Sequence, residues 1–580
     1  MKYPVKQKEG PFPMILTDEE TRAKNLGTGV WGTVTLDAIF RKSVQMHPDR
    51  LAIVDAPDRS EWTSGKPERL TYAEADTIVS RIAALFSHLG LAPDHVIGIM
   101  MPNTTITALT YLAAWRCGLI VAPIPLTWRD HSITPALAAT GTKAIVTMDR
   151  LENEDLGTPI RDIAAQLFGI RQLLGFGDRL AEGIINIDHA IAEIDTAEIP
   201  TEVNRKESAA DHVATITFTC TAEGQVVPVP RSHNQWIAMG LMPLLEARIE
   251  AGASILSPHM LTGLSGIGVG LVPWLLSSGT LHMHHFRNLS GLSDHCATSE
   301  PDHLLCPAGL VNPLSNMLKE KDIQTDMLAV WHGCHVPAAP ASVKTQSIVD
   351  VTILDELALV ARARGDNPIP HPLPLGQISV PTDAEQALHL LELQCEKLDT
   401  GLAGKRGTRE LLLVRGPMAP STEVMRNYDF VPTTPKGFLE TSILAEVTPG
   451  QRRTATPVSR SEGLIMIGGL PLGDNEVEDA YADHDAVRAS RLYVSGQKRL
   501  VPKMALAVVP EHAAQFSPQD ADDYAKAAGL ALHARPASIV RSVSIAQTLK
   551  RTEKGSEDKD ADAAAKLADA IGMLTRQNVG

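Results

Sequence analysis

Short apolar runs alternate with helical segments between residues 96 and 147, and this alternation restricts the fold more than any other feature of the chain. Residues 96–101 and 144–147 have the length and composition of buried strands. Pro102 and Gly118 lie between strands and helices, where the chain has to turn. Strands that alternate with helices are typical of a parallel sheet with helical crossover connections. The sequence therefore predicts a doubly wound α/β domain.

One of these helices is predicted in detail. Thr71 has the properties of an N-cap residue, and Glu74 follows three positions later, as in a capping box. Apolar side chains then recur at helical spacing up to Gly90, a residue that commonly follows the end of a helix. We therefore expect a helix that begins after Thr71 and ends before Gly90.

The character of the chain changes beyond residue 463. A strand-like run at 464–467 is followed by shorter strands and more polar helices, over a length typical of one small domain. We therefore expect a large α/β N-terminal domain over residues 1–466 and a small, mobile α+β C-terminal domain over residues 467–580, which ends in a charged tail. The glycine-containing stretch 385–410 is expected to form a surface insertion.

Charge and cysteine content limit the partners and the compartment. The chain has 53 Lys and Arg against 68 Asp and Glu, a net charge of −15, which repels nucleic acids and anionic membranes. Its six cysteines are widely spaced without a C-x-x-C pair, as is typical of reduced thiols in the cytoplasm. Residues 251–286 carry no charge, but Pro258, Pro273 and four histidines favour a buried core segment over a membrane span. We expect a cytoplasmic protein without a nucleic-acid partner or a membrane span.

Several short landmarks follow one another along the chain: residues 70–72 (Leu-Thr-Tyr), 101–103 (Met-Pro-Asn), 121–125, His259 with Gly263, 410–417, 437–441 and 475–478. Their order and spacing resemble the adenylate-forming superfamily of acyl-CoA synthetases, peptide-synthetase adenylation domains and luciferases. The resemblance covers nearly the whole chain. It implies a large domain that binds ATP and a carboxylic acid. It also implies two displacements: the carboxylate attacks the α-phosphorus of Mg²⁺-bound ATP, and a thiol such as CoA then attacks the acyl-adenylate.

Residues 219–228 are similar to the family's phosphate-binding loop. Three positions in and after the loop match the family and are the cofactor-binding candidates here: Thr219, Gly224 and His233. Four positions depart from the family: Ala222, Glu223, Val227 and Pro228. Two hydroxyl groups, a lysine and a backbone N–H are thereby lost, and a carboxylate faces the expected triphosphate. Arg231 is the one nearby residue that can compensate.

Two further ATP-binding motifs also differ from the family. Ala358 stands where the resemblance implies a metal-binding glutamate, although Asp355 or Glu356 can reach a cation in a shifted register. Thr441 is retained in the ribose-binding motif as a further cofactor-binding candidate. Ile443 replaces the aspartate of that motif, and an isoleucine side chain cannot accept hydrogen bonds.

The C-terminal domain holds the catalytic candidate. The family's basic pair is missing from the hinge after Gly463. The resemblance implies a C-terminal lysine that neutralises charge during adenylation, and Lys550 is our candidate, with Lys554 as a second option. The alternative for Lys550 is a solvated side chain in a charged tail.

Four residues fall where the family lines its acyl pocket, and they are the substrate-pocket candidates: His259, Gly263, Gly333 and Cys334. Ordinary packing of a glycine-rich core is the alternative for them. His282 and His284 alternate on one expected strand, but no carboxylate or cysteine completes a metal-ligand set, so we expect no metal there. Cys220 is expected to be a small replacement for serine rather than a nucleophile.

These observations favour an acyl- or aryl-CoA ligase-like protein whose ATP site is eroded. Such a protein is expected to bind an acyl ligand or a protein partner with little or no catalysis. The alternative is an active carboxylic acid–CoA ligase that uses ATP, Mg²⁺ and CoA and binds ATP through backbone amides at Gly224 and through Lys550. A third interpretation keeps only the thiol-dependent half reaction, with acyl-adenylate supplied by another protein.

Overall fold

The computed structural model describes residues 13–194, 203, 205, 208–221, 224–333, 347–367, 369–380, 387–397, 409–428, 430–448, 453–460, 464–467, 470–495, 503–510, 517–536 and 538–541. The chain divides into two compact units, which we describe separately. The large unit comprises Met1–Leu126, Thr134–Thr219 and Val227–Ser461. The small unit comprises Thr127–Ile133, Cys220–Val226 and Glu462–Gly580. The expected domain boundary after residue 466 stays a prediction.

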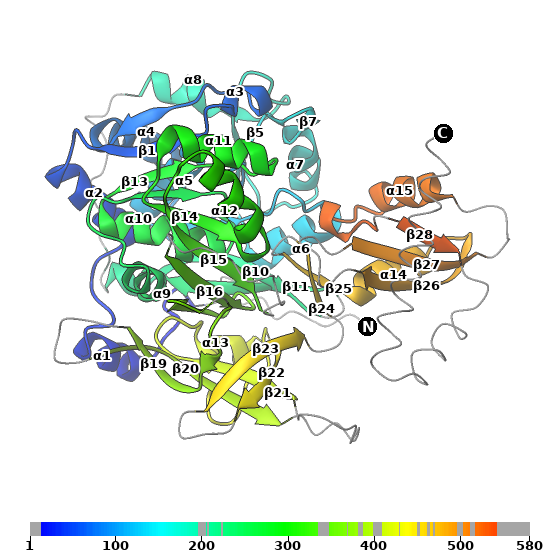
Figure 1. Ribbon diagram of the computed structural model, residues 1–580. Helices are drawn as coiled ribbons and strands as arrows, with labels where there is room; N and C mark the ends of the chain where they lie inside the picture. Colours follow the sequence, from blue (N-terminus) through cyan, green and yellow to red (C-terminus); the bar gives the residue numbers. More distant parts are fainter. Residues whose placement is uncertain are drawn as a thin grey trace. The chain divides into compact units, whose positions relative to one another are not determined.

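One sheet of the large unit contains seven strands in the order β11-β10-β4-β3-β5-β8-β9. Figure 1 labels three of them, β5, β10 and β11. The pairs from β10 to β9 are parallel. The two strands predicted from the alternating pattern are β3 and β5. The bounds are β3 (Val96–Met100), β4 (Ile120–Pro123), β5 (Ala144–Met148), β8 (Gln172–Phe176), β9 (Ile185–Asn186), β10 (Val213–Cys220) and β11 (Val226–Ser232).

The second sheet of the large unit contains eight strands in the order β17-β16-β15-β14-β12-β13-β1-β2. Its six inner strands are parallel, and the two edge strands are antiparallel to their neighbours. The six carboxyl ends therefore meet at one edge. The bounds are β1 (Leu51–Asp55), β2 (Arg69–Thr71), β12 (Ser254–Ser257), β13 (Thr280–Met283), β14 (His303–Pro307), β15 (Asp326–His332), β16 (Ile348–Leu354) and β17 (Ala358–Ala363).

Helices connect and cover these sheets. The predicted helix after Thr71 is α4 (Tyr72–His88), and the Thr71–Glu74 capping box is present. Helix α5 (Thr105–Arg116) contacts β4 of one sheet and β1 of the other, and every one of its residues is buried. The other helices of six residues or more among the described residues before residue 462 are α1 (Glu19–Gly27), α2 (Leu36–Met46), α6 (Asp130–Thr140), α7 (Gly157–Ala164), α8 (Ile187–Ala192), α9 (His233–Glu246), the π-helix η3 (Leu264–Leu271), α10 (Val272–Ser277), α11 (Leu289–Ser299), α12 (Val311–Glu320) and α13 (Thr422–Asn427).

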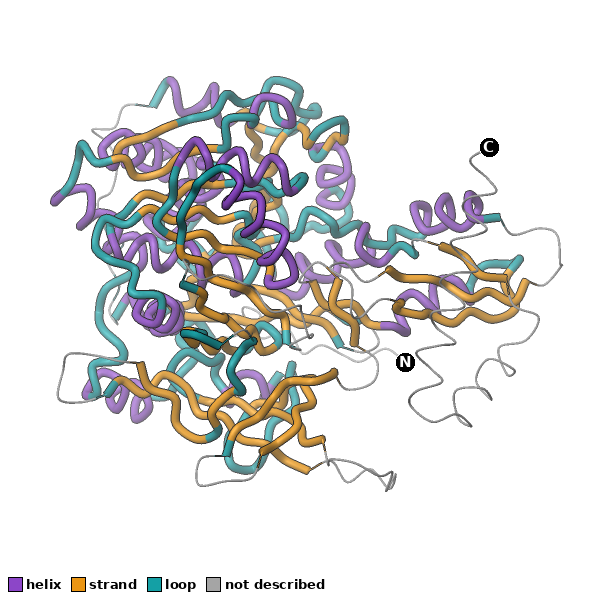
Figure 2. The backbone as a smooth tube through the Cα atoms, in the orientation of Figure 1, coloured by secondary structure: helices purple, strands orange, loops and turns teal. Residues whose placement is uncertain are grey.

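A third sheet of the large unit is antiparallel throughout and has the order β18-β23-β22-β21-β20-β19. Its strands are among those coloured orange in Figure 2. Its bounds are β18 (Leu373–Pro374), β19 (Gly376–Val380), β20 (Leu388–Lys397), β21 (Arg409–Arg415), β22 (Leu439–Thr448) and β23 (Thr454–Arg460). The expectation of a surface insertion at 385–410 was wrong for its described strand. Strand β20 lies between β19 and β21, and Leu390 and Leu393 are fully buried.

The small unit combines a three-stranded sheet, a short hairpin and two helices. The sheet has the order β26-β27-β28, and β24 pairs with β25 in the hairpin. Its elements are β24 (Leu464–Ile467), β25 (Leu470–Gly473), α14 (Asp474–Ala482), β26 (Val487–Ser495), β27 (Lys503–Pro510), α15 (Pro518–Ala527) and β28 (Ser538–Arg541). The predicted fold class, a doubly wound α/β unit with a small α+β unit, is confirmed. Among the described residues no helix is both long and apolar enough to cross a bilayer.

Candidate functional site

Ligands of parallel α/β sheets bind beyond the carboxyl ends of the strands, because the connecting loops there can carry polar side chains. At this edge of the eight-stranded sheet, His259 lies two residues beyond β12, and His332 is the last residue of β15. Gly333 follows β15, and Asp355 and Glu356 follow β16. The structure thus brings two predicted pocket residues, His259 and Gly333, to the same edge as both acidic candidates.

The turn formed by Asp355 and Glu356 is strained. Their φ angles are 51° and 54°, in the left-handed region that side chains other than glycine seldom adopt. Such a conformation costs of order 1 kcal/mol or more per residue and persists only where contacts hold it. Contacts from Ser442, Arg460 and Arg231 hold this turn.

Asp355 forms an ion pair with Arg460 at the end of β23. The two side chains are only 11% and 9% exposed, so the pair lies away from bulk water. The backbone N–H of Ser442 donates to the Asp355 carboxylate, and Arg460 also donates to the Ser442 hydroxyl at 2.5 Å. The Asp355 carboxylate is therefore already paired with a cation of the protein.

Glu356 is held by different groups. Its two carboxylate oxygens lie 3.2 and 3.1 Å from the backbone nitrogen of Leu264, which donates to them. Arg231 donates to the Glu356 carbonyl, and its guanidinium also donates to the Thr217 hydroxyl at 3.1 Å. Burial raises the pKa of Glu356 to about 7. This carboxyl group is therefore close to half-protonated at neutral pH.

The third predicted pocket residue, Gly263, lies directly against Glu356. A Cβ atom at Gly263 would come within 2.6 Å of a Glu356 carboxylate oxygen. A glycine is therefore needed here because the Glu356 carboxyl group approaches the backbone closely. The backbone conformation itself does not require glycine, since the φ angle of Gly263 is −169°, in the ordinary extended region. Gly263 thus lies against Glu356, Gly333 lies against Arg460, the partner of Asp355, and His259 lies at the same edge of the sheet. Cys334, the fourth, lies outside the described residues.

Two histidines at this edge are neutral. Burial, with a smaller contribution from His332, lowers the pKa of His259 to about 3. Burial followed by the charge of Arg460 lowers the pKa of His332 to about 4. Both imidazoles therefore stay uncharged throughout the physiological pH range.

The predicted cofactor-binding residues of the large unit lie on β10, α9 and β22. Thr219 is near the end of β10. His233 begins α9, and its Nδ1 accepts a hydrogen bond from the Leu36 N–H at 3.3 Å. The Thr441 hydroxyl donates to the Leu412 carbonyl at 2.8 Å, so it bonds within its own sheet.

The remaining members of the predicted set belong to the small unit. Gly224 has a φ angle of 78°, and a Cβ atom there would meet the Glu476 side chain at 2.5 Å. Burial raises the pKa of Glu476 to about 7. The catalytic candidate Lys550 lies outside the described residues, as do Ala222 and Glu223 of the loop.

The departures from the family's phosphate and ribose motifs have structural counterparts. Val227, which replaces the loop lysine, is 7% exposed within β11, and Ile443, which replaces the ribose aspartate, is fully buried within β22. No three His, Cys, Asp or Glu side chains of the described ranges lie close enough to hold a metal ion.

Sequence reasoning missed Arg460 and His332. Neither residue belongs to a motif that the resemblance implies, and Arg460 is 105 positions from its partner Asp355. One signal in the sequence could have indicated the pair. Ile443 replaces the motif aspartate, so a buried arginine near this position needs a carboxylate from another segment.

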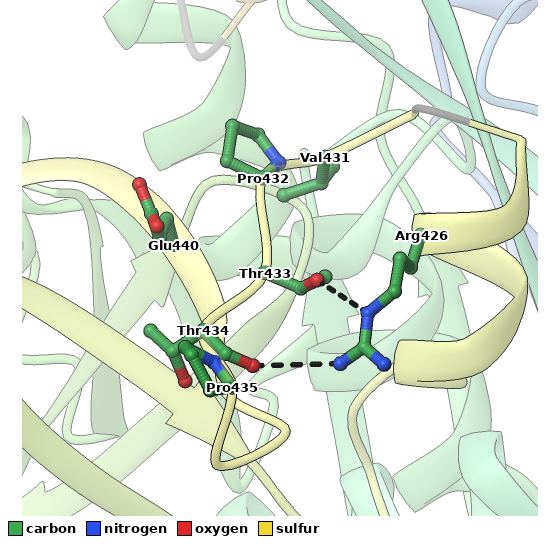
Figure 3. A pocket seen from close by; sticks show the side chains of 7 residues that line it. All are labelled: Arg426, Val431, Pro432, Thr433, Thr434, Pro435 and Glu440. Carbon is green, nitrogen blue, oxygen red and sulfur yellow. Dashed lines mark hydrogen bonds between the residues drawn. The ribbon is translucent and has the colours of Figure 1, made fainter.

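Two cavities lie beside the third sheet, apart from the residues described above. One of about 500 Å³ is lined by Arg426, Val431, Pro432, Thr433, Thr434, Pro435 and Glu440. Figure 3 shows the Arg426 guanidinium directed at this turn, where it donates to the Thr433 hydroxyl at 2.8 Å and to the Thr434 carbonyl at 3.4 Å. Arg426 also lines the second cavity, of about 900 Å³.

The two sheets with their polar carboxyl edge, together with the small α+β unit, define a fold of the adenylate-forming type. The chain belongs to the AMP-binding enzyme family, whose model matches residues 40–354. Solved structures agree in fold. The amide bond synthetase of Marinactinospora thermotolerans has a TM-score of 0.69 at 16% identity and covers 88% of this chain and 96% of its own. The o-succinylbenzoate CoA synthetase of Bacillus subtilis has a TM-score of 0.65 at 15% identity and covers 87% and 95%.

Relatives of known function match over shorter stretches. The medium-chain fatty-acid–CoA ligase of Escherichia coli is 24% identical over 235 residues, which are 40% of this chain and 39% of that protein. The salicyl-AMP ligase/salicyl-S-ArCP synthetase of Mycobacterium tuberculosis is 27% identical over 168 residues, which are 29% of this chain and 28% of that protein. The matches thus span well under half the length of these relatives.

Proposed function

We propose that this AMP-binding family protein binds an acyl or aryl carboxylic acid but has lost, or nearly lost, the ability to activate it with ATP. In this role it acts as a ligand-binding or partner-binding homologue of an acyl-CoA ligase. The Asp355–Arg460 ion pair carries the proposal. It occupies the neighbourhood of Ser442, where the resemblance implies the ribose-binding motif, and it engages Asp355, a carboxylate that could otherwise replace the lost motif aspartate.

The expected phosphate contacts support the same proposal. A triphosphate needs cations and backbone N–H donors, because its charge is otherwise uncompensated. Val227 supplies a buried apolar side chain instead of the lysine, and Pro228 has no N–H to donate. Arg231 does not replace the lysine, since it is fully buried and bonds to Thr217 and Glu356. The residues present therefore fit ATP and Mg²⁺ poorly.

The acid-binding half of the proposal rests on the pocket candidates and on the relatives. His259, Gly263 and Gly333 lie at the carboxyl edge, and Gly263 lies directly against Glu356. The names of the two relatives quoted above refer to a fatty acid and to salicylate, both carboxylic acids. We propose a carboxylic acid of one of these two kinds as the ligand.

The alternative is an active ligase, and family membership itself favours it. Such an enzyme would use ATP, Mg²⁺ and CoA, and would hold the nucleotide through backbone amides at Gly224 and through Lys550. It would release pyrophosphate only when a suitable acid is present.

Two measurements on the full chain separate these functions. We expect titration calorimetry with Mg²⁺·ATP to show no binding at millimolar nucleotide, and a panel of aliphatic and aromatic acids to cause no pyrophosphate release. Acid-dependent pyrophosphate release that disappears in Lys550→Ala would establish the ligase and overturn our proposal. Thioester formation only from added acyl-adenylate would instead indicate the thiol-dependent half reaction.

A further inference from the structure

The cavity of about 900 Å³ beside the third sheet takes no part in the proposed function. Its volume is in the range of sites that bind ligands larger than a single small ion. Helix α1 forms one wall, and strand β20, the end of β21 and the start of α13 form the other. Figure 1 shows α1 beside β19 and β20. None of the described residues that line this cavity belongs to the carboxyl edge of the eight-stranded sheet.

Helix α1 turns a polar face toward this cavity. Thr21, Lys24 and Asn25 of α1, and Thr28 just after it, recur at helical spacing and all line the cavity. A surface helix normally covers the body of a protein with an apolar stripe. In α1, by contrast, Asn25 is the one buried residue, at 7% exposed. The inner face of α1 is therefore better suited to bind a polar group than to pack against the sheet.

Three polar groups of the cavity are free to bind such a group. Within the described part of the chain, the side-chain amide of Asn25 and the ammonium groups of Lys24 and Lys436 form no hydrogen bond or ion pair. A buried amide is normally hydrogen-bonded, so the unpaired Asn25 points to a missing partner. Lys436 belongs to the other wall, where its carbonyl accepts from Arg415 at 2.8 Å.

Most other charged side chains of the cavity already have partners within the chain. The engaged side chains are Asp18, Glu392, Arg415 and Arg426. Glu423 is exposed and forms no ion pair among the described residues. Two free cations against one free carboxylate give the cavity a positive excess, although the chain as a whole has a net charge of −15. The charge of the cavity therefore favours an acidic ligand.

The buried part of the cavity is mainly apolar. Trp31 and Leu391 line it and are only 6% and 2% exposed, whereas Lys24 and Lys436 are exposed. The indole Nε1 of Trp31 donates to the Pro417 carbonyl at 3.1 Å, which fixes the segment after α1 to the loop after β21. A matching ligand therefore has apolar groups for the buried part and acidic groups for the exposed rim.

An extended peptide combines these properties. Its successive side chains point to opposite sides, so apolar side chains can face Trp31 and Leu391 while acidic ones reach the two lysines. The Asn25 amide has both a donor and an acceptor, and it therefore complements a backbone amide. A small inorganic anion would leave the apolar part unfilled, and an uncharged apolar ligand would leave Asn25 unpaired.

We propose that the cavity between α1 and the third sheet binds an extended segment of a partner protein in which acidic and apolar residues alternate. The carboxylates of this segment pair with Lys24 and Lys436, and one of its backbone amides bonds to Asn25. This inference goes beyond the proposed function, because the site is separate from the pocket candidates and takes a different class of ligand.

The test uses a fluorescein-labelled octapeptide of alternating valine and glutamate, and measures its fluorescence anisotropy with the full chain. We expect a Kd below about 100 μM. The same peptide with lysine in place of glutamate should bind at least about 10-fold more weakly, because like charges across an interface repel. Millimolar glutarate at constant ionic strength should not displace the acidic peptide. Displacement would indicate a site for small dicarboxylates and would overturn the peptide assignment.

Variants of the lining residues locate the peptide. The double variant Lys24→Glu/Lys436→Glu should lose at least about 10-fold in affinity, because two attractive pairs become repulsive. Asn25→Ala should lose about 5-fold through the missing hydrogen bonds. Glu423→Gln should bind about 2-fold more tightly, since it removes the free carboxylate. The matched control is Lys397→Glu, an exposed position at the end of β20 that does not line the cavity, and it should bind as wild type does.

Three results would overturn the proposal. The first is no binding of the acidic peptide by the wild-type protein at millimolar concentration, and the second is equal binding of the acidic and basic peptides. The third is an affinity that Lys24→Glu/Lys436→Glu changes no more than Lys397→Glu does. None of these results bears on acid binding at the carboxyl edge, so the proposed function is tested separately.

Discussion

Glu356 is the residue whose environment most affects how stability changes with pH. Burial raises its pKa from 4.5 to about 7, so the folded protein keeps a proton that the unfolded chain has already lost. This contribution to stability is complete below pH 4.5 and disappears as the pH rises to about 7. By linkage the total change is at most about 3 kcal/mol. Glu356→Gln mimics the protonated form, so we expect it to gain stability relative to wild type between pH 5 and pH 8.

Urea unfolding at the two pH values measures this effect. Glu423→Gln in α13 is the matched control, because Glu423 is exposed and its replacement should alter stability equally at both pH values. A Glu356→Gln variant whose stability relative to wild type is the same at pH 5 and pH 8 would show that Glu356 is ionised in the folded protein at both.

At the scale of single elements, the sequence predicted those strands and helices that are determined by a local pattern of residues. Strands β3 and β5 and the capped helix α4 follow from apolar periodicity and from the Thr71–Glu74 pair. Strand β20 was mistaken for part of a surface insertion, because the burial of Leu390 and Leu393 depends on pairing with β19 and β21 rather than on any local pattern. Long-range pairing of this kind leaves little trace in a short window of sequence.

A histidine of helix α11 contacts a histidine that directly follows strand β13, and protonation of this pair affects stability. His295 Nδ1 lies 3.2 Å from Nδ1 of His284, and both side chains are almost fully buried. Burial lowers the pKa of His295 to about 3 and that of His284 to about 4. The unfolded chain therefore binds protons below pH 6.5 that the folded protein cannot, and stability falls as the pH decreases.

The variant His295→Gln removes one such group. Between pH 7 and pH 5 we expect it to lose about 2 kcal/mol less stability than wild type, at about 1.4 kcal/mol per pH unit below 6.5. His88→Gln, at an exposed position of α4, should follow the wild-type curve. Equal acid sensitivity of His295→Gln and wild type in urea unfolding would contradict a neutral His295 in the folded protein.

At the scale of the whole molecule, the resemblance predicted the fold, which is confirmed, and a set of site residues, which stay predictions. It led to His259, Gly263 and Gly333, because those positions follow from the order of landmarks. It did not lead to Arg460 or His332, whose roles depend on which strands end side by side. Arg460 meets Asp355 only because β23 of one sheet ends beside the turn after β16 of another.

The division into two units leads to a final prediction. The pocket candidates His259, Gly263 and Gly333 belong to the large unit, so an acid bound by them should stabilise that unit alone. At a ligand concentration 100 times Kd, the gain is about 2.7 kcal/mol. We expect scanning calorimetry to resolve two transitions, since two compact units need not unfold together. Salicylate or octanoate should raise the temperature of one transition only, whereas Mg²⁺·ATP should move neither. A shift of either transition by Mg²⁺·ATP would show that the nucleotide binds, and would favour the active ligase.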